Sequence, residues 1–223
     1  MRTCIIIPTY NEAKEIAKLI GEVKGKNLDI LVVDDGSSDN TAQIAKNHGA
    51  TVIQNRINEG KGASLIKGFD YALSKGYDAV ITMDGDGQHH PEDIPYFLRL
   101  AEYSDSGIFI GNRMQKVKTM PRVRLLTNQF MSWLISGIAK QKIPDTQCGF
   151  RLIKKEVLQK LRLRTSKYEI ESEILLKTAR LGFKIESIPI KVIYNGAKSQ
   201  INPFIDTIRF IRFIIKEIWT TPY

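Results

Sequence analysis

Short apolar runs alternate with helix-forming patterns through the first half of the chain. The runs are rich in β-branched residues and predict five strands, at CIIIP (4–8), LDILVVDD (28–35), TVIQN (51–55), YDAVITMD (77–84) and GIFIGNR (107–113). Helical patterns lie between them, from Asn11 to about Lys24, after Gly36 up to Gly49, from 60 to Gly76, and from Pro91 to 102. This alternation predicts an α/β fold with a mostly parallel central sheet flanked by helices.

The second half of the chain differs in charge. No Asp or Glu occurs between Asp105 and Asp145, whereas seven basic residues do: Arg113, Lys116, Lys118, Arg122, Arg124, Lys140 and Lys142. Helical patterns follow at 122–140, 153–161 and 169–181, and then a strand-like segment, KIESIPIKVIY (184–194). Segment 202–219 predicts a helix with one apolar stripe and one charged stripe. The apolar stripe contains Phe204, Ile208, Ile211, Ile215 and Ile218, and the charged stripe contains Asp206, Arg209, Arg212 and Lys216.

Size and composition limit the class of protein. The chain has 223 residues, which is enough for one core, and its formal net charge of +9 suggests an anionic partner such as nucleic acid, a lipid surface or a phosphorylated substrate. Two cysteines make a disulfide scaffold or a cysteine zinc site improbable and fit a reducing cytoplasm. We expect no signal peptide and no transmembrane segment, because the longest uncharged stretch, 125–139, is polar in part and shorter than the roughly 20 residues of a span.

Two acidic turns follow two of the predicted strands, at Asp34-Asp35-Gly36 and Asp84-Gly85-Asp86. The carboxyl ends of parallel strands share one edge of a sheet, so four carboxylates would approach one cleft. Their repulsion calls for a cation or hydrogen-bond donors, and hard divalent ions such as Mg²⁺ prefer oxygen ligands of this kind. The bland alternative is a pair of solvated turns, since Asp and Gly are common turn residues.

Other binding motifs fit this sequence poorly. Asp84, Asp86 and Gln88 match the first three ligand positions of an EF-hand, but His89 stands where its Gly belongs and Pro95 where its Glu belongs. The GKGAS segment lacks the ending of a phosphate-binding loop, and no strand leads into G-x-G-x-x-G.

Six motifs occur in an order typical of one family: IIIPTYNE, VVDDGSSDNTAQIA, NEGKGASLIKGFDYA, MDGDGQHHPED, IGNR and DTQCGFRLIKKEVL. Together they closely resemble family 2 glycosyltransferases, in particular the polyprenyl-phosphate (dolichyl-phosphate mannose synthase-like) branch. The resemblance covers roughly residues 3–200. It implies a GT-A nucleotide-sugar-binding fold over 1–200, followed by an amphipathic C-terminal helix over 201–223.

The resemblance also implies roles for residues of the nucleotide pocket. Pro8, Tyr10 and Glu12 would line it, with Tyr10 against a base or ribose and Glu12 accepting from ribose hydroxyls. Asn11 could in addition cap the first helix. Asp35 matches the residue that accepts from the ring N–H of the base.

The D-x-D motif of the family holds Mg²⁺ or Mn²⁺ against the diphosphate of the donor. Asp84 and Asp86 match it, and Gln88 is a candidate third ligand. Lys61 would approach the nucleotide, or else be a solvated lysine. His89 and His90 are more simply explained as solvated loop residues than as metal ligands.

The resemblance also implies that basic residues lie near the phosphates of the donor or the acceptor. Arg113, Arg122 and Arg124 resemble the arginines placed near donor or acceptor phosphate, a role that suits the fork of the guanidinium. Lys198 and Ser199 resemble a further phosphate element, although in reversed order. Asp145 would act as a general base or would orient the sugar or the arginines, so the expected catalytic residues are Asp86, Arg113 and Asp145.

The expected activity is metal-dependent, inverting transfer of a hexose, mannose or glucose, from a GDP- or UDP-linked sugar to a polyprenyl (dolichyl or undecaprenyl) phosphate. The alternatives are a family 2 enzyme with a saccharide or protein acceptor, and a non-enzymatic module that binds nucleic acid or membrane. The favoured hypothesis involves no nucleic acid. It places the protein peripherally on the cytoplasmic face of a membrane and leaves the oligomeric state open. The last helix would face either lipid or protein, and the 122–140 helix would be a second contact.

Overall fold

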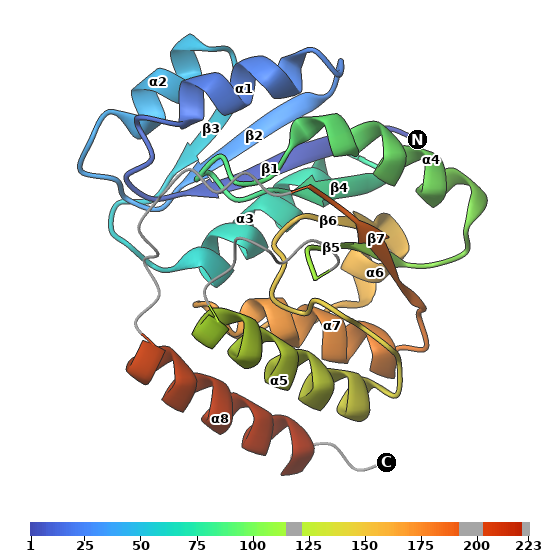
Figure 1. Ribbon diagram of the computed structural model, residues 1–223. Helices are drawn as coiled ribbons and strands as arrows, with labels where there is room; N and C mark the ends of the chain where they lie inside the picture. The colour runs from blue at the N-terminus through green and yellow to red at the C-terminus, as the bar shows by residue number, and fades with distance from the viewer. Residues whose placement is uncertain (115–121, 192–202, 220–223) are drawn as a thin grey trace.

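A seven-stranded sheet forms the centre of the protein (Figure 1). The computed structural model describes residues 1–114, 122–191 and 203–219. In spatial order the sheet is β3-β2-β1-β4-β6-β5-β7. The strands are β1 (Thr3–Thr9), β2 (Asp29–Asp34), β3 (Thr51–Gln54), β4 (Ala79–Thr82), β5 (Ile108–Asn112), β6 (Arg151–Lys154) and β7 (Ile185–Pro189). Strands β1 to β4 are parallel, β5 and β7 are parallel to each other, and β6 runs against both of its neighbours, β4 and β5.

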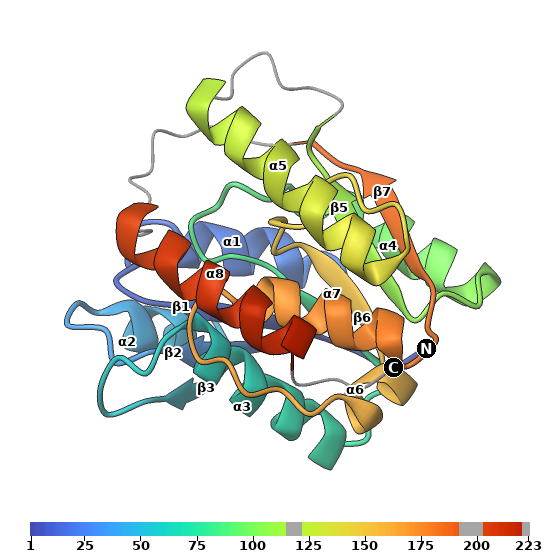
Figure 2. The same cartoon turned by 90° about the horizontal axis from the view of Figure 1, so that it is seen from below.

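Helices cover both faces of this sheet. They are α1 (Ile16–Lys24), α2 (Thr41–Asn47), α3 (Lys61–Ser74), the 3₁₀ turn η1 (Pro91–Asp93), α4 (Ile94–Tyr103), α5 (Arg122–Ala139), α6 (Lys155–Lys160), α7 (Ile170–Arg180) and α8 (Pro203–Trp219). Helices α1, α2 and α4 lie on one face, and α3, α6 and α7 lie on the other (Figure 1). Helix α5 packs on α7, and α8 runs on the same side of the molecule (Figure 2).

Burial explains the composition of the central strands. Every residue of β1 is buried, and so are those of β2 after its first residue, because helices cover both faces. A strand that is buried on both faces reads as a continuous apolar run instead of an alternating one. The predicted GT-A type of fold, α/β with a mostly parallel sheet, is therefore confirmed in its architecture.

The strand order changes direction between β1 and β4. From β1 the chain builds outward through β2 to β3, and it then returns through α3 to place β4 on the other side of β1. In open α/β sheets, ligands bind in the crevice beyond the carboxyl ends of the strands at such a reversal. The segments that follow β1 and β4 carry the PTYNE and DGD motifs, so both motifs flank this crevice.

The structure differs from the sequence analysis at β6 and at the start of α1, and it shows which side of α8 is buried. The helix predicted at 153–161 is confirmed as α6, which starts two residues later, but the sequence analysis did not predict the strand β6 that precedes it. Asn11 does not cap α1, which begins five residues later; it has a positive φ of 57° and accepts a hydrogen bond from the Ser38 backbone. On α8 the residues of the predicted apolar stripe whose side chains the structure describes, Ile208, Ile211 and Ile215, are exposed together, whereas Phe210, Phe213 and Ile214 are buried.

None of the described helices is both long enough and apolar enough to cross a membrane.

Candidate functional site

An acidic cluster forms where β1 and β4 end. Glu12 follows β1, and Asp84 and Asp86 follow β4. Burial and then the charge of Asp84 raise the pKa of Asp86. Burial, followed by the charges of Asp86, Asp39 and Asp84, raises the pKa of Glu12 to about 7. These shifts indicate that Glu12 and Asp86 lie within the electrostatic influence of the neighbouring carboxylates.

Lys61, at the start of α3, is the main cation facing this cluster. Its Nζ lies 2.5 Å from Asp84 Oδ1 and 2.7 Å from Glu171 Oε1. Burial raises the pKa of Asp84, but nearby positive charge, that of Lys61 first, lowers it by more, so that it lies well below its usual range. Lys61 is therefore neither a free nor a solvated lysine.

Glu171 continues this pairing toward β6. Its Oε2 lies 2.5 Å from Nη2 of Arg151, which is itself fixed by three backbone carbonyls, those of Thr146, Cys148 and Glu171. Asp84, Lys61, Glu171 and Arg151 thus form an alternating row of charges, and the last two members are buried. The sequence analysis did not identify Glu171. The signal that could have found it is an acid that occupies an otherwise buried position of α7.

His89 is 2% exposed, which corrects the expectation of a solvated loop residue. Its Nδ1 accepts a hydrogen bond of 3.1 Å from the Asp84 backbone N–H, and its ring lies 5.3 Å from that of Phe150. A ring nitrogen that accepts carries no proton, and burial lowers the pKa of His89, so the proton of the neutral ring sits on Nε2, 3.8 Å from Asp84 Oδ2. His89 therefore fixes the backbone of the acidic turn.

Two glycines permit the close packing around Asp84. A Cβ on Gly149 would lie 2.7 Å from both carboxylate oxygens of Asp84, and a Cβ on Gly85 would lie 2.7 Å from Thr9 Cγ2. Any side chain at either position would displace the turn. The glycine requirement therefore comes from the space around the carboxylates.

The other acidic turn, after β2, does not join this cluster. The Asp34 carboxylate is buried and accepts hydrogen bonds from Ser37. The Asp35 carboxylate accepts from Asn55 Nδ2 at 2.8 Å and from the backbone N–H groups of Glu59 and Gly60 at 2.9 and 2.7 Å. Internal donors thus satisfy Asp34 and Asp35, whereas Glu12, which was not among the four carboxylates expected to gather, lies within the electrostatic influence of Asp84 and Asp86.

The remaining residues of the predicted nucleotide pocket lie along the crevice. Pro8 is buried in β1, and Tyr10 and Glu12 are half-buried in the loop that follows. Tyr168, which the sequence analysis did not identify, precedes α7 and lies within the electrostatic influence of Lys61, Asp84 and Glu12. The role of each residue in binding a nucleotide stays a prediction.

Arg113 and Asp145 form a buried ion pair at the end of β5. The guanidinium donates from Nε to Oδ2 at 2.7 Å and from Nη2 to Oδ1 at 2.9 Å, and the Arg113 backbone N–H donates to Oδ2 at 3.0 Å. Arg113 is 8% exposed and Asp145 0%. Burial lowers the pKa of Arg113, but its bonds to Asp145 and the charges of Asp145 and Asp84 raise it by more, so the guanidinium stays charged.

Four predicted site residues are less well defined. Arg122 and Arg124 lie in the first turn of α5, where the structure describes the backbone alone, and Lys198 lies outside the described residues. Gln88 donates its backbone N–H to Asp86 Oδ1 at 3.0 Å, and its side-chain amide makes no hydrogen bond within the described part of the chain.

The carboxylate oxygens of the acidic cluster suit a hard divalent cation whose coordination is completed by a bound substrate. Within the described residues, no three His, Cys, Asp or Glu side chains converge closely enough to hold a metal ion alone. Asp84 and Asp86 nevertheless supply two neighbouring carboxylates, the charge of Asp84 helping to raise the pKa of Asp86, and Mg²⁺ is commonly bound by one or two carboxylates together with substrate phosphates.

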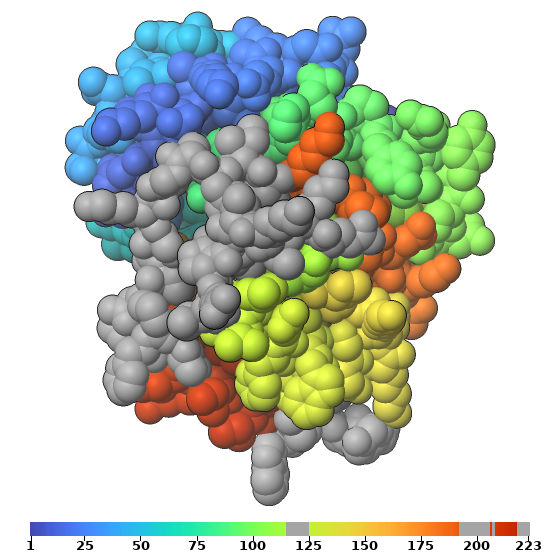
Figure 3. Space-filling model, viewed as in Figure 1, coloured from blue at the N-terminus to red at the C-terminus, as the bar shows by residue number. Residues whose placement is uncertain are grey.

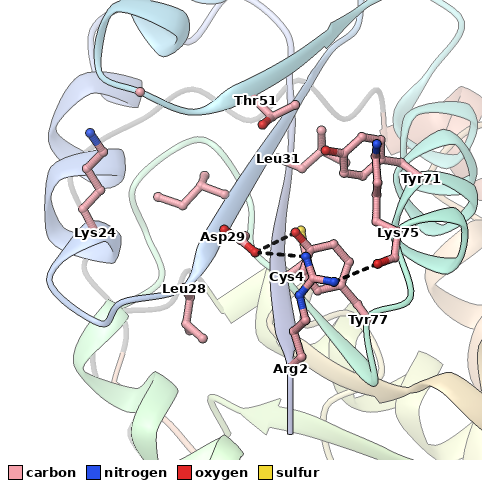
Figure 4. A pocket seen from close by; sticks show the side chains of 12 residues that line it. Arg2, Cys4, Lys24, Leu28, Asp29, Leu31, Thr51, Tyr71, Lys75 and Tyr77 are labelled. Carbon is pink, nitrogen blue, oxygen red and sulfur yellow. Dashed lines mark hydrogen bonds and ion pairs between the residues drawn. The ribbon is translucent and has the colours of Figure 1, made fainter.

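A separate cavity of about 360 Å³ lies at the opposite edge of the sheet (Figure 4). Its walls come from the amino ends of β1 to β3 and from the segment before β4. There Tyr77 Oη donates to Asp29 at 2.7 Å, and Arg2 Nη1 donates to the Lys75 carbonyl at 2.8 Å. These internal pairs use the polar groups at the centre of the cavity, which lies far from the acidic cluster.

Similarity to known proteins agrees with this geometry. The model of glycosyl transferase family 2 matches residues 4–162. The chain is 32% identical over 213 residues to the UDP-N-acetylglucosamine–dolichyl-phosphate N-acetylglucosaminyltransferase of Methanococcus voltae, covering 85% of each protein. It is 30% identical over 206 residues to the undecaprenyl-phosphate mannosyltransferase of Micrococcus luteus, covering 86% of this chain and 84% of that protein.

A solved structure extends the likeness to the fold. Glucosyl-3-phosphoglycerate synthase from Mycobacterium tuberculosis, in complex with Mn²⁺, UDP and phosphoglyceric acid, superposes with a TM-score of 0.73 at 18% identity, covering 98% of this chain and 77% of that one. The family match spans well over half of the chain, and the relatives cover most of it at 30% identity or more. This chain therefore belongs to glycosyl transferase family 2.

Proposed function

We propose that the protein transfers a hexose from a nucleoside diphosphate sugar to a polyprenyl phosphate. The acidic cluster of Glu12, Asp84 and Asp86 at the sheet reversal is the observation that carries the proposal. Both named relatives act on a lipid phosphate, which supports this class of acceptor. One relative is named for a UDP-linked donor and the other for mannosyl transfer, so GDP- and UDP-sugars are both candidate donors.

In the proposed reaction, an oxygen of the acceptor phosphate attacks the anomeric carbon from the face opposite the leaving group. The new bond joins this carbon to the phosphate oxygen, the bond to the diphosphate oxygen breaks, and the configuration inverts. A phosphate monoester already carries negative charge at neutral pH, because its second pKa is about 6. The acceptor therefore needs positioning and charge neutralisation more than deprotonation.

Arg113 is proposed to face the reacting phosphates. Its Nε and Nη2 are held by Asp145, and its Nη1 makes no hydrogen bond to the described part of the chain. A guanidinium fixed on one side presents its remaining donors in one direction, which suits a phosphate. Asp145 is proposed to be the residue that orients Arg113, because it is fully buried and holds three donors, a poor arrangement for a general base.

A divalent cation, Mg²⁺ or Mn²⁺, would be held by Asp84 and Asp86, with Gln88 as a third ligand. When bound, it would supply charge neutralisation for the diphosphate. Tyr10, Glu12 and Tyr168 would then line the nucleoside side of the crevice, on the evidence of their positions around the cluster.

Contact with a membrane surface is part of the proposal, since the acceptor is a lipid. The outer side of α5 and α8 carries exposed apolar side chains together with exposed basic ones. The apolar set comprises Leu126, Phe130, Trp133, Ile208, Ile211 and Ile215, and the basic set comprises Arg209, Arg212 and Lys216. Both helices lie toward the lower end of the molecule in the view of Figure 3. Apolar and basic groups on one surface suit an anionic bilayer.

The direct test uses purified protein, Mn²⁺, a polyprenyl phosphate in detergent, and radiolabelled UDP-glucose, UDP-N-acetylglucosamine or GDP-mannose. We expect lipid-extractable label with one donor and its loss in Asp86→Asn. The variant Asp78→Asn, at an exposed aspartate of the opposite sheet edge, serves as the matched control. Transfer to a soluble saccharide with no label in the lipid would contradict the proposed acceptor.

A further inference from the structure

Lys61 lies where two carboxylates need the same positive charge. Its ammonium contacts Asp84 on one side and Glu171 on the other, at 2.5 and 2.7 Å. Its side chain is 18% exposed and that of Glu171 6%, so neither group is well solvated. A cation bound at Asp84 would meet this ammonium directly, and two cations in contact with one carboxylate repel each other.

Glu171 is held independently of Lys61. Arg151 contacts its carboxylate at 2.5 Å, and the same guanidinium donates to the Glu171 backbone carbonyl at 2.8 Å. Because Arg151 also binds the carbonyls of Thr146 and Cys148, this end of the row is anchored to the loop before β6. Glu171 would therefore keep its position if Lys61 lost its contact with Asp84.

We propose that Lys61 is an exchangeable counter-cation for Asp84: it occupies this carboxylate until a divalent cation arrives, and Glu171 then retains it beside the site as a donor to the diphosphate. The inference rests on the proposed function and deepens it. Lysine suits this exchange because its ammonium has three donors on a flexible stem. If one N–H group of the Lys61 ammonium stays bonded to Glu171, the N–H groups that no longer contact Asp84 lie next to the place where the phosphates would bind.

The proposal makes Lys61 a positioning residue with two opposed effects. Its ammonium competes with the metal while nucleotide is absent, and it helps to bind the diphosphate once the metal is present. Glu171 acts through Lys61. A neutral side chain at position 171 leaves the ammonium to Asp84 alone, which makes the exchange harder.

The test measures Mn²⁺ binding by electron paramagnetic resonance and nucleotide binding by calorimetry, with no turnover involved. Hydrogen bonds to charged groups are strong enough for single losses to change affinity by about tenfold or more. We expect Lys61→Met to bind Mn²⁺ about tenfold more tightly without nucleotide, and to bind UDP or GDP with Mn²⁺ about tenfold more weakly. Glu171→Gln should bind Mn²⁺ more weakly than the wild type.

Lys75→Met is the matched control, because Lys75 follows the same helix at the opposite sheet edge and should change neither affinity. If Lys61→Met does not fold, Lys61→Gln provides the same loss of charge with the hydrogen-bonding capacity retained. Unchanged or weaker Mn²⁺ binding by the Lys61 variant, with normal binding by the wild type, would overturn this inference alone. Absence of Mn²⁺ binding by the wild type would overturn the proposed metal site as well.

Discussion

The buried pair of Arg113 and Asp145 allows the sharpest prediction, because its parts can be removed singly or together. In Asp145→Asn the guanidinium, 8% exposed, keeps its charge and loses its anionic partner. Breaking a buried ion pair by removing one partner typically costs about 3–5 kcal/mol. We take the lower end, about 3 kcal/mol, because the asparagine carbonyl can still accept one of the three hydrogen bonds that Asp145 accepts. For a chain of this size the melting temperature should fall by roughly 6–12 °C.

The assay is urea unfolding followed by circular dichroism. Asp105→Asn, at an exposed aspartate, is the control and should change the free energy of unfolding by less than about 0.5 kcal/mol. The double variant Arg113→Met with Asp145→Asn removes both charges, and it should be more stable than Asp145→Asn alone, since a buried pair is often replaceable by uncharged groups. A loss below about 1 kcal/mol in Asp145→Asn, or a double variant less stable than the single one, would refute the reasoning.

The same variants separate the two roles considered for Asp145. If Asp145 only orients Arg113, the rate loss in the double variant should equal that of Arg113→Met, because the two residues act as a unit. If Asp145 is a general base, its loss should multiply that of Arg113. The comparison needs rates measured below the unfolding transition of each variant.

Three further predictions address the acidic cluster and the outer helices. Burial and neighbouring carboxylates raise the pKa of Glu12 to about 7, so the folded state binds more protons than the unfolded one between pH 4.5 and 7. The stability that this proton contributes is present below pH 4.5 and is lost as the pH rises through 7. In the presence of a chelator, Glu12→Gln should therefore have a higher melting temperature than the wild type at pH 8 and the same melting temperature at pH 4.5. Gly149→Ala should weaken Mn²⁺ binding at least tenfold, because its Cβ would lie 2.7 Å from both Asp84 oxygens; unchanged calorimetric affinity would contradict this. Phe130→Ser should reduce sedimentation with anionic vesicles, whereas Tyr103→Ser, at a more exposed aromatic residue on α4, should not; equal losses would argue against a specific lipid face.

Much of the fold could be predicted from local patterns. Apolar runs flanked by turn residues define β1 to β5, and Gly76 closes α3 with a φ of 72°, which few other residues adopt. The prediction failed at β6, which has four residues and lies between β4 and β5, far from both in sequence. Nothing local marks such a strand, because its stability comes from the two partners that it pairs with.

The charge pairs of the site were beyond prediction for the same reason. Lys61 and Glu171 are 110 positions apart, and Arg113 and Asp145 are 32 apart. The residue types were visible in the sequence, and a surplus of basic residues near 113–142 was also visible. Which acid meets which base depends on how α3, α7 and the loop before β6 pack, and this follows from the whole core.

The two acidic turns show how topology assigns function to similar sequences. Both turns join an apolar strand to aspartates and glycine, yet the turn after β2 uses its carboxylates to tie Ser37 and the 59–60 backbone in place. In the turn after β4, burial and then the charge of Asp84 raise the pKa of Asp86. The difference follows from strand order. Strand β2 has a parallel neighbour on each side, whereas β4 lies next to β1 at the point where the strand order reverses, and no crossover connection covers the carboxyl ends of the strands there. The carboxylates of the turn after β2 are bound by neighbouring side chains and backbone N–H groups, whereas those of the turn after β4 face Glu12 and Lys61 in the crevice where open α/β sheets bind ligands.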